Sequence, residues 1–164
     1  MRMVTLLSPL AATVLLLSAA SASAQAPPPY GPAITLEQAK KIMAGAEAEA
    51  KKNSWPVVIA ILDSGGQVVM LHRLDNAQWG SNEVAREKAH SAVAFRRPTK
   101  VFQDLIAQGG ANLRLLNLSG ASMLEGGIPI VVDGKIVGGV GVSGVTSQQD
   151  AQIGQSGIDA LMTK

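Results

Sequence analysis

The stretch WPVVIAILDSGGQVVMLHRLD, residues 55–75, decides the fold of this chain. Two runs rich in β-branched residues flank the segment Asp63–Gly66, whose glycines supply the positive φ that a tight hairpin needs. Apolar residues occupy both the odd and the even positions of the two runs, whose side chains point to opposite faces of a sheet. This predicts a hairpin covered on both faces. The domain is therefore built outward from two antiparallel strands that need packing partners on each side.

A second β-rich stretch, SMLEGGIPIVVDGKIVGGVGVSG, occupies residues 122–144. Asp133–Gly134 is a strong hairpin signal, and the stretch predicts two or three strands. Its end contains a literal G-x-G-x-x-G over residues 139–144, but the preceding strand arrives through a hairpin and not through a βαβ crossover. We therefore reject a dinucleotide site. We expect these small residues to let a helix, another subunit or a flat ligand approach the sheet closely.

Helices are predicted on either side of the two hairpins. Thr35 and Thr146 each open one with the capping-box pattern T-x-x-Q, and the second runs to Lys164.

The middle of the chain predicts two further helices. Ser81 is expected to cap a helix that reaches about Arg96, because Pro98 disfavours helical geometry in the residue before it. A short helix follows over residues 99–107, and residues 108–120 predict a loop with at most one helical turn. The order α-β-β-α-α-β-β-β-α predicts an α+β domain, with an antiparallel sheet of about five strands flanked by helices.

The N-terminus predicts export. One positive charge at Arg2 precedes an apolar run and a small-residue ending, which is the pattern of a signal peptide over residues 1–24. A Pro-rich tether over residues 25–34 and a single domain over residues 35–164 follow. We expect a periplasmic or extracellular protein with no stable membrane span once the signal is removed.

Composition excludes several classes of site. The chain has no cysteine, which rules out thiolate zinc sites, iron–sulfur clusters, cysteine nucleophiles and covalent c-type haem attachment. Without Arg2, 13 basic residues stand against 12 acidic ones, and no basic block is interleaved with aromatic residues. We therefore expect no nucleic-acid partner.

The chain has two histidines, and each has more than one interpretation. His72 lies near a strand end and is either a core-edge imidazole or a ligand. His90 shares a helix face with Glu83, Arg86 and Glu87, so it is either solvated, at an interface or a ligand. No serine lies in a nucleophile elbow, and nothing points to a catalytic triad.

Three segments together resemble the GlcG/HbpS-like haem-binding (haem-degrading domain) family. They are VVIAILDSGGQVVMLHRLDNA (57–77), KAHSAVAFRRPT (88–99) and GGIPIVVDGKIVGGVGVSGVTSQQDAQIGQSGIDAL (126–161). The resemblance runs in order from Thr35 to Leu161, and its most specific element is the C-terminal block.

This resemblance implies a profilin-like antiparallel sheet, assembly into a homo-oligomer, and haem binding or degradation in some members. Other members are encoded beside catabolic enzymes, including those of glycolate oxidation, and the fold also occurs as a domain of some cobalamin adenosyltransferases. Activity therefore varies within the family.

The residues permit haem as a cofactor. His72 and His90 are the candidate axial ligands of iron, and Arg96 and Arg97 offer two guanidinium groups that suit the propionates. The resemblance also implies a haem contact at Thr99. Further possible donors are Tyr30, Met43, Met70, Met123 and Met162.

Three functions follow from these residues. The first is an exported protein that binds haem or another tetrapyrrole. The second is an accessory or sensory domain that binds a small organic acid through the same arginines. The third is an enzyme, either haem-degrading or catabolic, that uses His90 or Glu125; sequence leaves enzymatic activity uncertain, with a non-enzymatic binding protein favoured.

Overall fold

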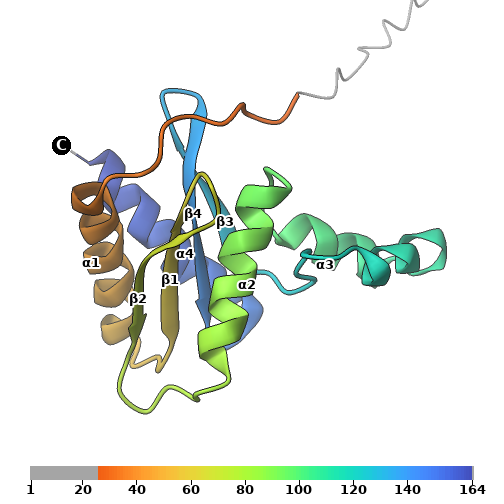
Figure 1. The fold of residues 1–164 in the computed structure, drawn as a ribbon. Helices are drawn as coiled ribbons and strands as arrows, with labels where there is room; N and C mark the ends of the chain where they lie inside the picture. The colour runs from red at the N-terminus through yellow and green to blue at the C-terminus, as the bar shows by residue number, and fades with distance from the viewer. Residues whose placement is uncertain (1–25, 164) are drawn as a thin grey trace, which may run out of the picture.

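The computed structural model describes residues 26–163 as one sheet between two layers of helix (Figure 1). The predicted signal peptide, residues 1–24, lies outside the described residues. In chain order the elements are α1 (Leu36–Lys52), β1 (Val58–Asp63), β2 (Val68–Arg73), α2 (Ser81–Ala94), α3 (Lys100–Ala107), the 3₁₀ helix η1 (Gly110–Asn117), β3 (Gly127–Val132), β4 (Lys135–Ser143) and α4 (Ser147–Met162). The predicted α+β class is confirmed.

The sheet has the strand order β2-β1-β4-β3, and every neighbouring pair is antiparallel. The two predicted hairpins, β1–β2 and β3–β4, are joined along β1 and β4, from Val58 opposite Ser143 to Asp63 opposite Gly138. The described chain has four strands where about five were expected. The Gly-rich segment does not form a strand of its own, because β4 runs unbroken through its glycines.

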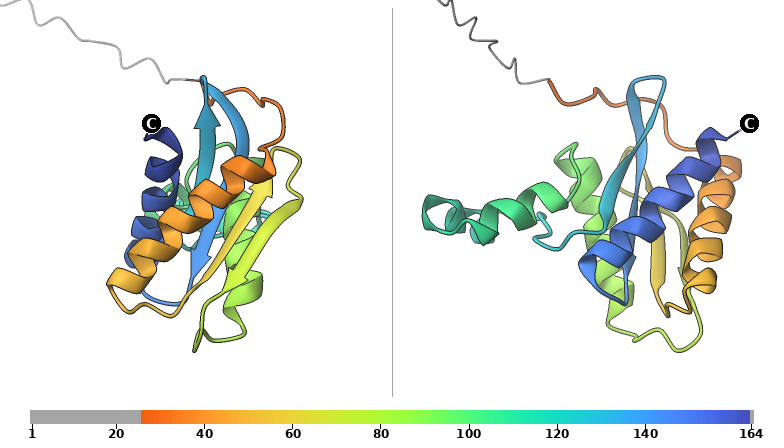
Figure 2. Two further views of the ribbon diagram at one scale, coloured as in Figure 1. Left: turned by 90° about the vertical axis from the view of Figure 1, so that its left-hand side faces the viewer. Right: turned by 180° about the vertical axis from the view of Figure 1, so that it is seen from behind.

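Helices cover both faces of the sheet. Figure 2 shows α1 and α4 side by side on one face and α2 on the other. The larger core lies under α1 and α4 and includes Ile42, Ile59, Val140 and Ile153, all with no exposed surface. The expectation of a first hairpin covered on both faces is confirmed for β1, whereas β2 is an edge strand with mostly exposed side chains.

Glycines in β4 allow α2 to lie close to the sheet. A Cβ at Gly141 would collide with the backbone oxygen of Ala85, and one at Gly139 would lie 2.7 Å from Val93 Cγ2. The close helix approach that we expected from this segment is therefore confirmed.

The first part of the β3 edge offers few free backbone groups to a further strand. Thr99 holds the outward backbone groups of Gly127, donating its N–H to the Gly127 oxygen and accepting the Gly127 N–H at 2.9 Å. Two residues further on, Pro129 has no N–H to offer at the next outward position.

Local helix signals were mostly accurate. Both capping boxes, at Thr35 and Thr146, are present. Ser81 does not cap α2, so that prediction was wrong: Gly80 is the N-cap, and the buried Ser81 hydroxyl instead pairs with Ser143 Oγ at 3.1 Å.

An arm formed by α3 and η1 projects away from the sheet (Figures 1 and 2). The segment expected to hold at most one helical turn contains eight 3₁₀ residues. Only Phe102 of α3 and no residue of η1 is buried, so the arm is held to the body mainly at its base.

The described part of the Pro-rich segment packs against the domain. The Gly31 N–H donates to Ile136 O at 2.8 Å, the Ile136 N–H donates to Pro29 O at 2.9 Å, and the Tyr30 hydroxyl donates to Val93 O at 2.9 Å. Within residues 26–163 no helix has the length and apolarity to cross a membrane.

Candidate functional site

His90 lies on α2 between two glycine turns. A Cβ at Gly66, in the β1–β2 turn, would lie 3.3 Å from His90 Cδ2, and one at Gly120 would lie 3.6 Å from His90 Cε1. Both glycines have positive φ, 79° and 78° respectively. Because neither glycine has a side chain, both turns lie close against the edges of the ring, and the open space beside the ring and these two turns is here called the slot.

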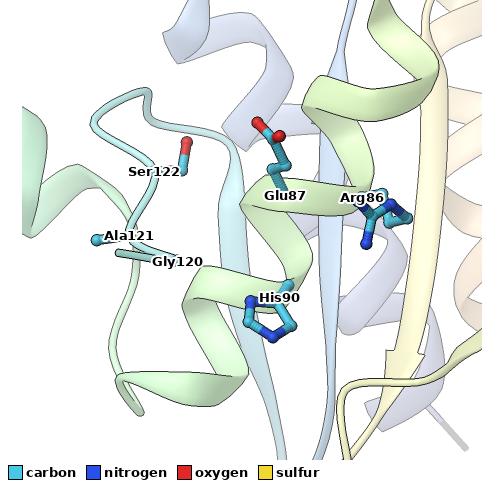
Figure 3. A pocket seen from close by; sticks show the side chains of 6 residues that line it. All are labelled: Arg86, Glu87, His90, Gly120, Ala121 and Ser122. Atoms are coloured by element: carbon cyan, nitrogen blue, oxygen red, sulfur yellow. The ribbon is translucent and has the colours of Figure 1, made fainter. Parts of the chain in front are cut away.

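A pocket of about 340 Å³ opens beside this ring (Figure 3). Arg86, Glu87 and His90 line it from α2, and residues 120–122 line it from the facing loop. A smaller hollow of about 120 Å³, bordered by Tyr30 and residues 64–66, lies against the same histidine. His90 thus contacts two hollows.

The His90 imidazole has no hydrogen-bond or ion-pair partner among residues 26–163. The ring is only partly exposed, and it belongs to none of the side-chain pairs in the described chain. Arg86 of the same pocket pairs with Glu83 one turn earlier. A half-buried imidazole without a partner beside a hollow is available to a ligand.

His72 is in a different setting. Its Nδ1 lies 2.7 Å from Glu47 Oε1 of α1, and its side chain is 46% exposed. The hydrogen bond from His72 holds the pKa of the Glu47 carboxyl below its usual 4.5, although burial opposes the shift. His72 lines neither hollow beside His90, so the structure does not bring the two histidines to one site.

Arg96 and Arg97 form the corner after α2. The Arg96 guanidinium lies 5.8 Å from the Tyr30 ring centroid, and that of Arg97 lies 5.8 Å from the Phe102 centroid. Both arginines border a broad hollow of about 600 Å³ with Pro27 and Pro28. Neither is within ion-pair distance of a carboxylate in the described part of the chain, and Arg96 has a φ of 54°.

Thr99 is a structural contact in this fold. Its side chain is fully buried, and its hydroxyl accepts the Gly127 N–H as described above. Because Gly127 is the first residue of β3, this hydrogen bond connects the α2–α3 corner to the sheet.

The sequence reasoning missed a buried ion pair. Lys88 of α2 donates to Asp150 Oδ2 at 2.8 Å and to Val142 O at 2.9 Å, and both charged side chains are at most 3% exposed. Burial raises the pKa of Asp150, while the hydrogen bond from Lys88 opposes the increase. The missed signal was spacing, since Lys88 falls within the apolar stripe formed by Ala85, Ala89 and Ala92.

The described residues do not suggest a metal site made of protein ligands alone. No group of three or more histidine or acidic side chains between residues 26 and 163 could hold an ion. An isolated imidazole is instead the kind of ligand that a metal already held in a macrocycle accepts. Together, this imidazole and the slot bordered by Gly66 and Gly120 form the candidate ligand site of this small α+β domain.

Comparison with known proteins identifies the family. The family model described as "Haem degrading protein HbpS-like" matches residues 34–159, and the chain belongs to this family. It is 38% identical over 110 residues to Protein GlcG of Escherichia coli strain K12, covering 67% of this chain and 81% of GlcG.

Two solved structures show the same fold. The complex of PduOC with haem superposes with a TM-score of 0.72 at 31% identity, over 78% of this chain and 94% of PduOC. The structure of HbpS gives a TM-score of 0.71 at 32% identity, over 79% of this chain and 90% of HbpS.

Proposed function

We propose that this protein binds haem or a closely related tetrapyrrole in the slot beside His90, with the His90 imidazole as axial ligand. The observation that carries the proposal is the unpartnered imidazole between Gly66 and Gly120, bordered by two hollows. The description of the family as haem-degrading and the haem complex of the relative PduOC support the same chemistry.

The surroundings of the slot suit a flat, partly charged ligand. Bound haem would supply an iron centre, and the protein's contribution would be the donor nitrogen and the shape of the slot. Arg86 lies in the same pocket, and Arg96 contacts Tyr30, which borders the other hollow. Either guanidinium is of the kind that pairs with a propionate.

A haemin titration followed by absorbance tests the site. His90→Ala is expected to abolish the saturable Soret shift, whereas His72→Ala should titrate like the wild type, because His72 is bonded to Glu47 outside the slot. Gly120→Leu, which fills the slot without removing the imidazole, should weaken binding as well. Equal titration of wild type and His90→Ala would refute the assignment.

A second candidate function has its own observation. Arg96 and Arg97 border one hollow and have no carboxylate partner among the described residues, which suits a small organic acid. Thermal shift with a panel of mono- and dicarboxylates distinguishes this function. The organic-acid function predicts that a carboxylate raises the melting temperature of the wild type and of His90→Ala. It predicts no such increase in the double variant Arg96→Gln/Arg97→Gln.

Export and self-association complete the proposal. The small-residue ending at Ala24 predicts cleavage before Gln25, which N-terminal sequencing of the protein from the periplasm or medium tests.

Exposed apolar side chains gather on and near the arm, where copies of the chain would meet: Leu113, Leu116, Leu118 and Leu124 are 38–62% exposed. Light scattering of Leu113→Lys/Leu116→Lys is expected to show a smaller assembly than the wild type.

A further inference from the structure

A separate groove runs between the β3 edge and α4. It has a volume of about 350 Å³, and it shares no lining residue with either hollow beside His90. Pro98, Ile128 and Ala151 give it apolar walls, and Gln148 gives it an amide. Its size is at the low end of the range for small-molecule sites.

Glu125 lines this groove as a buried carboxylate held in one orientation. Only 8% of the residue is exposed. Gln103 fixes it with two hydrogen bonds: its amide donates to Glu125 Oε2 at 3.2 Å, and its oxygen accepts the Glu125 N–H at 3.0 Å. A carboxylate removed from water is normally paired or hydrogen-bonded on both oxygens.

The second oxygen of this carboxylate is free to receive a donor. Glu125 Oε1 has no hydrogen-bond partner among residues 26–163, and it is not among the side-chain atoms fully shielded from solvent. Lys100 also lines the groove, but its ammonium binds both oxygens of Asp104, at 2.8 and 2.9 Å. Glu125 therefore makes no direct ion pair within the described chain, although the hydrogen bond to Asp104 and, after it, the charge of Glu125 help to raise the pKa of the exposed Lys100 ammonium.

The β3 edge does not favour an added strand as the occupant. Thr99 already holds the outward groups of Gly127, and Pro129 has no N–H. A peptide that adds to a sheet edge depends on those main-chain hydrogen bonds. The groove is therefore suited to a ligand held by side chains.

We propose that this groove binds a small organic cation, a primary ammonium or guanidinium group on a short aliphatic chain. The cationic group donates to Glu125 Oε1 in a charge-assisted hydrogen bond. The aliphatic chain lies against the apolar wall formed by Ile128 and Ala151. Haem, which carries two carboxylates, is repelled by the same glutamate, so the two sites take ligands of opposite charge.

Titration with n-butylammonium chloride, followed by amide chemical shifts of the ¹⁵N-labelled protein, tests this site. Saturable shifts are expected at Gly126, Gly127 and Ala151, with 1-butanol producing none. Glu125→Gln keeps an acceptor for Gln103 and removes the charge, so it should weaken binding at least tenfold. Glu37→Gln, which removes an exposed carboxylate on α1, is the matched control and should titrate like the wild type.

Ala151→Leu provides a second variant, because it fills the groove from α4 while leaving Glu125 in place. It is expected to abolish the shifts at Gly126 and Gly127. Three results each overturn the proposal: no saturation in the wild type up to about 50 mM probe, well above a millimolar dissociation constant; unchanged affinity in Glu125→Gln; or unchanged affinity in a folded Ala151→Leu.

Discussion

Replacing Lys88 by methionine is expected to lower the free energy of unfolding by about 3–5 kcal/mol, the usual cost of leaving one charge of a buried pair alone. Lys88 extends from α2 to Asp150 on α4, so one side chain connects the two helical layers. Methionine keeps much of the length and removes the ammonium. The Asp150 carboxylate, 3% exposed, then has no cation beside it.

The loss of unfolding free energy in each single variant depends on which contacts the remaining side chain keeps. In Asp150→Asn, the amide oxygen can still accept the Val145 N–H, which lies 3.2 Å from Asp150 Oδ1, but the amide NH₂ then faces the buried Lys88 ammonium, so this variant should also lose about 3–5 kcal/mol. The double variant has no buried charge left unpaired. We therefore expect a coupling of about 2 kcal/mol between the two changes, within the range for contacting residues.

Urea unfolding monitored by the fluorescence of Trp55 and Trp79 measures these values. The two tryptophans are the only ones in the chain, and Trp55 packs against the larger core. Lys100→Met and Asp104→Asn form the control cycle, since those side chains are 54% and 51% exposed. That exposed pair should be worth less than about 0.5 kcal/mol.

Two results would refute this reasoning. One is a loss below about 1 kcal/mol in Lys88→Met, which is less than the desolvation cost of an unpaired buried charge. The other is additivity of the two single changes, which would show that the buried contact is not energetically coupled. The first outcome would also mean that water reaches Asp150.

Three further predictions concern the fold. Ser54 has a φ of 57° directly after α1, where glycine is favoured, so Ser54→Gly should raise stability by about 1 kcal/mol; an unchanged or lower urea midpoint would contradict this. Because His72 lowers the pKa of Glu47 below 4.5, the stability this carboxylate contributes is present above pH 4.5 and is lost as the pH falls through the lowered value. His72→Ala should therefore flatten the acid side of the stability–pH curve, by less than about 1 kcal/mol because the pair is partly exposed, and a curve as steep as that of the wild type would argue against it. Thr99→Val leaves the Gly127 N–H without an acceptor and should cost about 1–3 kcal/mol by urea unfolding, with haemin affinity of the folded protein unchanged; a selective loss of haemin affinity would instead make Thr99 a ligand contact.

Local signals in the sequence were enough to predict the two hairpins and the main helices. The hairpins at residues 63–66 and 133–134 and the caps at Thr35 and Thr146 each depend on a few adjacent residues. One prediction that was wrong depended on a distant partner. Ser81 matched the pattern of a cap, but Ser143, on a strand 62 residues later, provides the contact for its hydroxyl.

The candidate sites depended more on tertiary structure. The sequence offered both histidines as candidate ligands, and only the tertiary structure shows that His72 is paired with Glu47 whereas His90 lies unpartnered between Gly66 and Gly120. Glu125 carries no local signature that reveals its burial, and the only local sign for Lys88 is its position within the apolar stripe of α2.

The sequence by itself determined the α+β class, the two hairpins, the main helices and the family resemblance, because backbone propensity and hydrophobic period act over a few residues. The tertiary structure alone decided which polar side chains lie in hollows and which are paired. Those outcomes depend on segments such as the β1–β2 turn and the loop at Gly120 meeting across α2. No local pattern encodes such a meeting, because burial and pairing belong to the packed arrangement of the whole chain.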